Sequence, residues 1–334
     1  MTLDPILLIG GYGAIGTSTA RTLRADHPNV PLLIGGRDRV KAVKAAAEIG
    51  NAEGVVLDLS AEDLGLGQRP VSAVAVFLRD DKATSLRFAQ SRGVPHFGIA
   101  SGLQEIGPEV AAFMHRPNAA PVVLGAEWLV GATTVPTLEL AKAFSEVHDI
   151  ALGALVDEQE VIGSASTADI EHLSTTFPAA LARRDRAYSW LLGEDSTAEF
   201  HAVDGTAVKA AAFSSIDIVS LATVTGAANV QFNLASGVSS TRRRGGPLST
   251  EIVIELAGMD HEGRQLRTRH AVVHDGTVRL TGLGAAMVLE RLLGLDGNPA
   301  APAGLYFPYQ LLDGTAYIPR LEETGGAIIE LEVL

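Results

Sequence analysis

The stretch from Pro5 to Arg21, PILLIGGYGAIGTSTAR, constrains the fold of this chain more than any other feature. Its apolar run, residues 6–9, is typical of a short strand that is buried on both faces. Glycines follow it with the spacing G-x-G-x-x-G, and apolar positions at helical spacing begin at Ile15. The stretch therefore predicts a strand, a tight turn and a helix, in that order.

This glycine spacing, between a strand and a helix, is that of a dinucleotide-binding turn. Gly11 permits the turn, Gly13 lets a pyrophosphate approach the backbone, and Gly16 lets the helix pack close to the strand. The free N–H groups at the start of the helix, at the positive end of its dipole, can then hold the phosphates. We expect the following residues to contact the cofactor: Gly11, Tyr12, Gly13, Ala14, Ile15 and Gly16.

A second apolar run, residues 30–34, indicates which dinucleotide is bound. An NAD site usually has Asp or Glu at the end of this strand, where the carboxylate accepts from the ribose 2′-hydroxyl. Here Gly36 is followed by Arg37, whose planar guanidinium can grip a 2′-phosphate and stack on adenine. Asp38 fits a cap of the next helix. We therefore expect NADP(H) as the cofactor, with Gly36 and Arg37 among its contacts.

Further strands and helices alternate as far as residue 127. The strands are expected at 55–57, 71–78, 95–100 and 122–125, with helices at 38–49 and 83–92. This alternation predicts an α/β fold, a Rossmann doubly wound parallel sheet. Because ligands bind at the carboxyl ends of such strands, the expected cofactor contacts also include Asp58, Leu59, Leu78 and Arg79, with Ser101 at the same edge. Asp58 could accept from the adenine amine or cap the following turn.

After Glu127 the pattern changes to that of a second domain of α+β type. Residues 150–156 alternate as one face of a strand, and Ile252 to Leu256 alternate with Glu251 and Glu255 as in a half-exposed antiparallel strand. Residues 271–273 and 278–280 are expected to be its partners. Such a sheet face lacks an obvious cover within the chain, so we expect a homodimer.

Two helices are expected beyond residue 127 besides the one at 132–144. Ile170, Leu173, Phe177 and Leu181 repeat at helical spacing, and residues 285–293 form a final helix. The expected domains are residues 1–127 for dinucleotide binding, 128–282 for substrate binding and dimerisation, and 283–334 as C-terminal elements that return to the Rossmann domain.

Composition restricts the partners. The formal net charge of −13 disfavours nucleic acid and anionic membranes, and 47% hydrophobic residues suit a folded globular chain. There is no cysteine, no basic segment before the first apolar run and no apolar stretch of membrane-spanning length. His270 and His274, on one strand, would lie about 13 Å apart, too far to share a metal. We expect a cytoplasmic protein that binds a small-molecule substrate and no metal.

Three motifs, GGYGAIG, GGRDRVKA and LDLS, together resemble the saccharopine dehydrogenase-like family of NAD(P)-dependent oxidoreductases, and the tail GLYFPYQLL is similar to that family's closing segment. The resemblance implies a Rossmann domain completed by C-terminal elements and an inserted α+β domain for substrate contacts and dimerisation. It also implies oxidation or reduction of a carbon–nitrogen bond. Family members often have Asp after the fifth strand and a Pro-Gly pair before the next helix. Here these positions are Gly98 and Val130-Gly131.

Hydride transfer also needs a donor or a positive charge beside the developing anion. The candidate catalytic residues are Tyr188, His172 and Glu127. Tyr188 could instead pack with Trp190 in the core, and His172 could be an exposed helix residue. Arg242 to Arg244 could clamp a substrate carboxylate or form a flexible, solvated loop.

The leading hypothesis is an NADPH-dependent reductase that acts on a C=N or C=O bond of a small molecule. The chain has no G-x-S-x-G motif and no tyrosine followed by lysine four positions later, so hydrolase and short-chain dehydrogenase chemistry are unsupported. Two alternatives stay open, an NADPH-dependent enoyl (C=C) reductase and a regulator that senses NADP(H) without catalysis.

Overall fold

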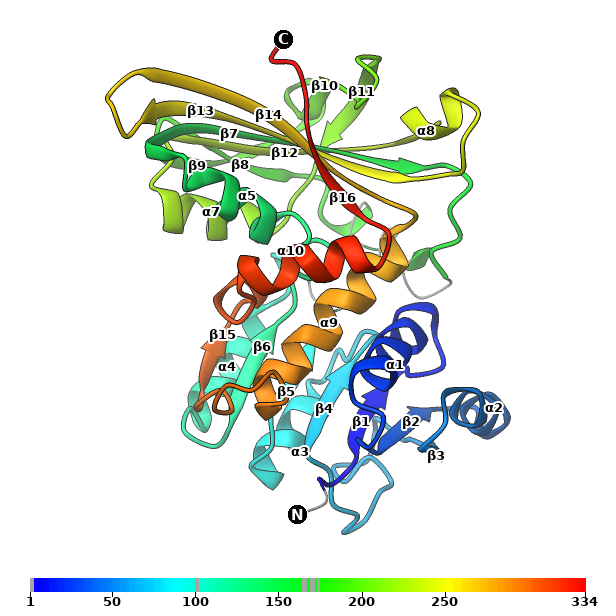
Figure 1. Ribbon diagram of the computed structural model, residues 1–334. Coiled ribbons are helices and arrows are strands. Elements are labelled where there is room, and N and C mark those ends of the chain that lie inside the picture. The colour runs from blue at the N-terminus through cyan, green and yellow to red at the C-terminus, as the bar shows by residue number, and fades with distance from the viewer. Residues whose placement is uncertain (1–2, 100–101, 164–166, 169–171, 173–174) are drawn as a thin grey trace. The chain divides into compact units, whose positions relative to one another are not determined.

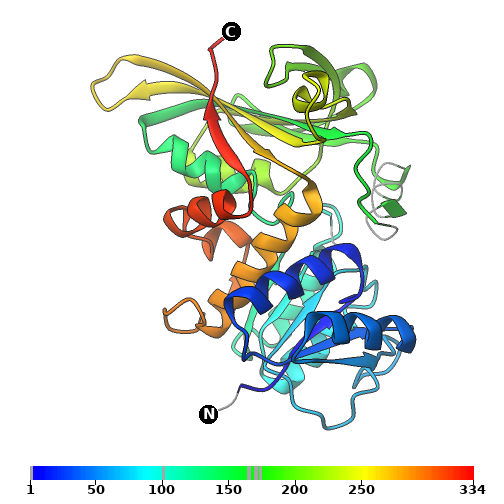
Figure 2. The ribbon, with the colours of Figure 1, turned by 45° about the vertical axis from the view of Figure 1, so that its right-hand side comes forward.

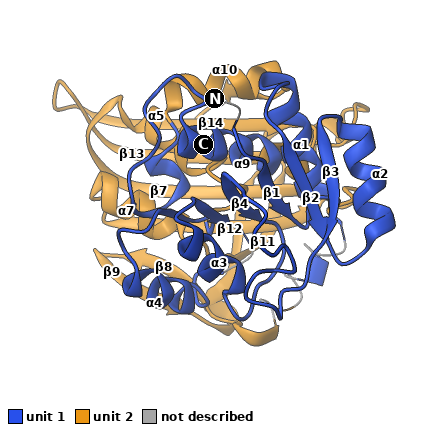
Figure 3. Cartoon of the chain, turned by 90° about the horizontal axis from the view of Figure 1, so that it is seen from below, with its two compact units in different colours: residues 1–126, 163–169, 281–312 blue, residues 127–162, 170–280, 313–334 orange. Residues whose placement is uncertain are grey.

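A computed structural model describes residues 3–99, 102–163, 167–168, 172 and 175–334 of the chain. The chain divides into two compact units, which Figure 3 colours separately. Unit 1 comprises residues 1–126, 163–169 and 281–312, and unit 2 comprises residues 127–162, 170–280 and 313–334. Within the described part of the chain, no helix combines the length and apolarity that crossing a membrane requires.

Unit 1 is built on a seven-stranded sheet in which every pairing is parallel. The strand order is β15-β6-β5-β4-β1-β2-β3. The strands are β1 (Ile6–Ile9), β2 (Leu32–Gly36), β3 (Ala52–Val56), β4 (Ala73–Val76), β5 (His96–Gly98), β6 (Pro121–Leu124) and β15 (Gly304–Tyr306). The chain winds outward from β1 to β3 and then returns to β4 on the other side of β1, which confirms the doubly wound Rossmann topology.

Helices cover this sheet (Figures 1 and 2). They are α1 (Ala14–Asp26), α2 (Arg39–Ile49), α3 (Thr84–Arg92), α4 (Gly107–His115) and the C-terminal part of α9 (Thr277–Leu293). Phe88 of α3 packs in one cluster with Leu7 and Val74, whereas an added Cβ at Gly282 of α9 would lie 2.3 Å from Ser18 Oγ of α1. Residues of β1, β2, β4, β5 and β6 are buried whichever way they point, as in a sheet with helices on both faces, and the edge strands β3 and β15 are partly exposed.

Unit 2 contains a nine-stranded mixed sheet with helices. Its main path runs β10-β11-β12-β7-β13-β14-β16, and β8 extends from β12 and carries β9. The strands are β7 (Phe144–Asp157), β8 (Ala180–Arg184), β9 (Ala187–Leu191), β10 (Thr197–His201), β11 (Ala207–Ala212), β12 (Asn229–Gly237), β13 (Thr250–Asp260), β14 (Gln265–His274) and β16 (Ala327–Glu330). The helices are α5 (Thr134–Ala141), α7 (Asp217–Thr225), α8 (Ser240–Arg243) and α10 (Gly314–Glu323). This mixed unit confirms the expected additional α+β region.

Three expectations about chain organisation are wrong. Residues 278–280 open α9 instead of forming a strand, because Glu160 Oε1 accepts from the Thr277 amide at 2.6 Å and caps the helix. Leu181 lies in β8, and Ile170 and Leu173 of the same predicted helix fall outside the described residues. The last part of segment 283–334 does not join the Rossmann sheet, because β16 pairs with β14 in unit 2.

The predicted half-exposed strand around Glu251 is also corrected. Glu251 has no exposed surface, and its Oε2 accepts from the Val203 amide at 3.1 Å and from the Ser240 hydroxyl at 2.7 Å. The turn before β11 and the segment at α8 therefore cover this part of the sheet within the chain. The open face that motivated the homodimer is smaller than expected, and the dimer stays a prediction.

Candidate functional site

The glycine turn between β1 and α1 is tightly folded. The Gly10 amide donates to the Gly35 carbonyl at 2.9 Å, and the Gly13 amide donates to the Gly10 carbonyl at 2.8 Å. An added Cβ at Gly16 would lie 2.5 Å from Gly10 O and 2.7 Å from the Gly11 Cα. Gly16 is therefore required by the contact between helix and turn, as the motif predicts.

Gly13 differs from Gly16 because its side-chain direction is nearly open. It is exposed, it has φ −74° and ψ 171°, and an added Cβ would meet only Gly10 O, at 3.1 Å. Any L-residue adopts such a backbone, so the fold alone does not demand glycine here. Among the described residues no side chain caps α1, so its first N–H groups are available to an anion as far as these residues show. The turn fits a pyrophosphate, which needs close backbone approach and free amides.

The end of β2 is shaped by the ring of Tyr12. An added Cβ at Gly36 would lie 2.2 Å from Tyr12 Cε1, and the Asp38 amide donates to the Tyr12 hydroxyl at 3.4 Å. Gly36 therefore makes room for this ring. Asp38 caps α2, since its Oδ1 accepts from the amides of Val40 and Lys41 at 2.9 and 3.1 Å.

Arg37 lies between these two positions and is exposed. Its side chain has no hydrogen bond or ion pair to the rest of the chain as far as the structure describes it. The guanidinium beside the glycine turn is thus available to an anionic ligand.

The residues after β3 and β4 have partners within unit 1. Asp58 Oδ1 accepts from the Ser60 amide and hydroxyl at 2.8 and 2.6 Å, and these bonds hold the pKa of Asp58 below its ordinary value. This is the turn-capping alternative, and one carboxylate oxygen is used in it. Arg79 pairs with Asp81 at 2.7 Å and with Glu105 at 3.2 Å.

Leu59 and Leu78 are partly buried and pack against the hydrophobic cluster of the sheet. Leu78 Cδ2 lies 3.4 Å from the position that a Cβ on Gly10 would take, so Leu78 lines the glycine turn. Ser101, expected at the same sheet edge, falls outside the described residues.

A polar cluster between β4 and β5 was not predicted. The Ser85 hydroxyl donates to Asp80 Oδ2 at 2.6 Å and lies 3.1 Å from His96 Nε2. Burial lowers the pKa of His96 to about 4, so the ring is neutral at neutral pH. The adjoining cavity, lined also by Gly98 and Glu109, measures about 20 Å³ and is too small for a substrate. The one sequence feature that could have predicted this cluster is the position of Asp80 directly after a predicted strand.

Glu127 is buried in unit 2. Its Oε2 accepts from the Thr134 hydroxyl at 2.8 Å and its Oε1 from the Ser220 hydroxyl at 3.2 Å, so it links α5 to α7. Asp217 lies on the same helix as Ser220 and accepts from the Trp128 amide at 2.8 Å, and burial raises the pKa of Asp217. These contacts favour a structural role for Glu127.

The other two catalytic candidates have separate surroundings. His172 is partly buried, and its Nδ1 lies 3.3 Å from the Thr176 hydroxyl. Tyr188 on β9 is 45% exposed and Trp190 is 51% exposed, so the core-packing alternative for this pair is wrong. The Arg183 guanidinium lies 5.0 Å from the centroid of the Tyr188 ring. Of the three candidates, Tyr188 is the most accessible.

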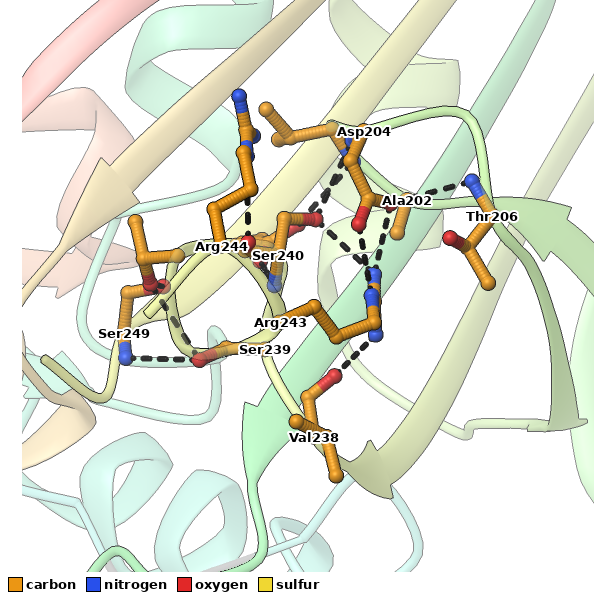
Figure 4. Close-up of polar contacts among 12 residues, drawn as sticks. Ala202, Asp204, Thr206, Val238, Ser239, Ser240, Arg243, Arg244 and Ser249 are labelled. Carbon is orange, nitrogen blue, oxygen red and sulfur yellow. Dashed lines mark hydrogen bonds and ion pairs between the residues drawn. The ribbon is translucent and has the colours of Figure 1, made fainter. Parts of the chain in front are cut away.

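The arginine run after β12 is held by carboxylates. Arg242 pairs with Asp157 at 2.7 Å, and Arg243 grips Asp204 with two bonds of 2.7 and 2.8 Å. Figure 4 shows Arg243 also reaching the Val238 carbonyl, and Arg244 Nε donates to the Ser240 carbonyl at 3.2 Å. The expected flexible loop is therefore a fixed structural element of unit 2.

The fold and the glycine turn together define a Rossmann-type architecture with a second, mixed-sheet unit. Neither a protein-family model nor a curated protein sequence matches the chain. Among solved structures, saccharopine dehydrogenase (L-Glu forming) from Saccharomyces cerevisiae is similar, with a TM-score of 0.68 and 14% identity over 98% of this chain and 99% of that chain.

Two further structures share the architecture. Homospermidine synthase from Legionella pneumophila, solved in complex with NAD, has a TM-score of 0.66 and 9% identity over 99% of this chain and 91% of that chain. Amine dehydrogenase from Mycobacterium smegmatis has a TM-score of 0.52 and 11% identity over 92% of this chain and 96% of that chain. The expected likeness in fold to saccharopine dehydrogenase is thus confirmed.

Proposed function

We propose that the protein is an NADPH-dependent oxidoreductase that acts on a C=N or C=O bond of a small molecule. The observation that carries this proposal is the glycine turn, where Gly13 is exposed and no side chain of the described residues caps α1. The names of the structural neighbours support it. Two are called dehydrogenases, one of them an amine dehydrogenase, and homospermidine synthase was solved with NAD.

The preference for NADPH is supported by Arg37. Its exposed guanidinium follows Gly36 directly, at the position where an NAD site usually has a carboxylate. A guanidinium binds a phosphate through paired N–H donors, and such charge-assisted bonds are about twice as strong as neutral ones. The 2′-phosphate would distinguish NADPH from NADH.

In this proposal the cofactor would supply the hydride. The chain would bind and orient the cofactor and the substrate, and it would donate a proton. The Ala14 amide and the N–H groups that follow it at the start of α1 would hold the pyrophosphate, and Leu78 would border it. We propose Tyr188 as the proton donor, because its phenol is accessible while Glu127 is buried and bonded to two hydroxyls. His172 is the second candidate for the donor.

Cofactor titration tests the first half of the proposal. NADPH and NADH are titrated into wild type, Arg37→Ala and the matched control Arg39→Ala, which removes a neighbouring exposed charge. We expect NADPH to bind wild type and Arg39→Ala about ten- to a hundredfold more tightly than NADH, with the preference lost in Arg37→Ala. Equal wild-type affinities would overturn the NADP assignment.

Turnover tests the second half. Oxidation of NADPH is followed with imines formed from 2-oxo acids and amines, with simple ketones, and with α,β-unsaturated carbonyl compounds. Activity on the imines or ketones that falls in Tyr188→Phe supports the proposal. Activity confined to unsaturated compounds would favour the enoyl reductase, and tight NADPH binding without turnover of any of them would favour the sensor.

A further inference from the structure

A groove on unit 1 is lined by basic side chains and has no part in the glycine turn. It lies against α3 and α4 and measures about 390 Å³, within the usual range of about 300–1,000 Å³ for small-molecule pockets. None of its lining residues belongs to the turn or to the ends of β1 and β2. It is therefore a second candidate binding region.

Three cationic or titratable side chains line the groove: Arg87 from α3, His115 at the end of α4, and Arg116 after it. All three are exposed, and in the described part of the chain none of these side chains has a hydrogen bond or an ion pair. Glu62 is the one acid in the lining. The two arginines of the groove outnumber its one acid, whereas the chain as a whole has a net charge of −13.

Several arginines elsewhere on the protein are engaged by acids or carbonyls, although Arg37, as far as the structure describes the chain, is not. This holds for Arg24, Arg69, Arg79, Arg242, Arg243, Arg264 and Arg269. Arg87 and Arg116 thus differ from these side chains in retaining all their donors for a ligand.

The floor of the groove is preformed. Thr84, Phe88 and Gln90 are each less than a tenth exposed, at 4%, 2% and 6%. The Gln90 side-chain amide donates to the Arg116 carbonyl at 3.5 Å, so the residue that carries one guanidinium is tied to the helix that carries the other. Little backbone ordering would be needed on binding, which favours affinity.

We propose that this groove binds a small molecule that carries a phosphate group. Two guanidinium groups offer planar pairs of N–H donors that match phosphate oxygens. The phosphate could belong to a nucleotide or to an inorganic polyphosphate, and both would use the same guanidinium contacts. The proposal does not depend on the oxidoreductase function.

The test uses full-length protein carrying Gly13→Val, which removes phosphate binding at the glycine turn. ADP and inorganic pyrophosphate are titrated by calorimetry into this protein, into the same protein with Arg87→Gln and Arg116→Gln, and into a control with Arg184→Gln and Arg267→Gln. The control pair is exposed and removes equal charge from unit 2.

We expect one saturable site that the groove variant weakens by at least about tenfold and the control leaves within about twofold. Tighter binding of ADP would identify a nucleotide site, and tighter binding of pyrophosphate an inorganic one. No saturable binding of either probe, or equal affinities in the groove variant and the control, would overturn the proposal. The same titrations are repeated in the wild-type background, where we expect two sites and the loss of one in the groove variant. This result tests the groove independently of how Gly13→Val folds. The double variant Arg87→Gln, Arg116→Gln should bind NADPH with the affinity of wild type. Loss of phosphate binding in the groove can then be distinguished from loss of cofactor binding at the glycine turn.

Discussion

Replacing Gly13 with valine should abolish dinucleotide binding while leaving the fold intact. The backbone at Gly13 has φ −74° and ψ 171°, which valine adopts readily, and the new Cβ would meet only Gly10 O, at 3.1 Å. The added methyl groups would fill the space through which a pyrophosphate reaches the amides of α1. Losing two charge-assisted bonds of about 1.5–3 kcal/mol each corresponds to roughly 10²- to 10⁴-fold weaker binding.

Calorimetry with NADPH measures the affinity, and thermal unfolding measures both the fold and the cofactor effect. At a concentration of 100 times its Kd, a ligand stabilises the folded state by about 2.7 kcal/mol. Wild type should show this gain, and Gly13→Val should show none at the same concentration. Without cofactor, its thermal midpoint should stay within a few degrees of wild type.

Gly16→Ala is the matched control, because its added Cβ would lie 2.5 Å from Gly10 O and 2.7 Å from the Gly11 Cα. These are backbone atoms that cannot rotate away, so overpacking should cost about 1–3 kcal/mol of folding stability. If Gly13→Val kept the cofactor-dependent stabilisation of wild type, the phosphates would have to bind elsewhere, and the assignment of this turn would fail.

The remaining predictions concern pH, packing and assembly. Because burial lowers the pKa of His96 from 6.5 to about 4, the unfolded chain binds a proton between these pH values that the folded chain does not. Stability should therefore fall by up to about 3 kcal/mol as pH drops through this window, and urea unfolding should show a flatter dependence in His96→Gln. The Arg243 guanidinium lowers the pKa of Asp204 far below 3.8, so Asp204→Asn should be destabilised above this pH, and acid titration should show the difference from wild type vanishing as pH falls. Gly36→Ala should lower the thermal midpoint because the added Cβ would clash with the Tyr12 ring. The further substitution Tyr12→Ala should restore the midpoint. Light scattering should give twice the chain mass of 34.9 kDa, and a single species of 34.9 kDa would refute the homodimer.

The Rossmann sheet was predictable because its signals are local. An apolar run such as Ile6–Ile9 and a glycine turn each occupy a few consecutive residues, and their order determines a parallel sheet. Errors arose where a distant residue decides the structure. Residues 278–280 read equally well as a strand, and α9 begins there because Glu160, 117 residues earlier, caps it.

Burial of charged residues in unit 2 was missed for the same reason. Glu251 alternates with apolar residues as an exposed position would, yet its carboxylate accepts from Val203 and Ser240, which no local pattern pairs with it. The arginine run has the composition of a solvated loop, and only the folded chain brings Asp157 and Asp204 to it. Sequence periodicity reports which face a side chain occupies, whereas its partners depend on topology.

Within the proposed function, the preference for NADPH over NADH depends on one side chain. The absence of a carboxylate at the end of β2 would by itself favour NADPH. However, residue 36 has no room for any side chain, because the Tyr12 ring lies against it. Asp38 is the nearest acid in sequence, and its Oδ1 is committed to two amides of α2. What remains is Arg37, exposed and without a partner in the described structure. The packing of Tyr12 therefore explains why residue 36 is glycine. The proposed preference for NADPH depends on the Arg37 guanidinium that follows it.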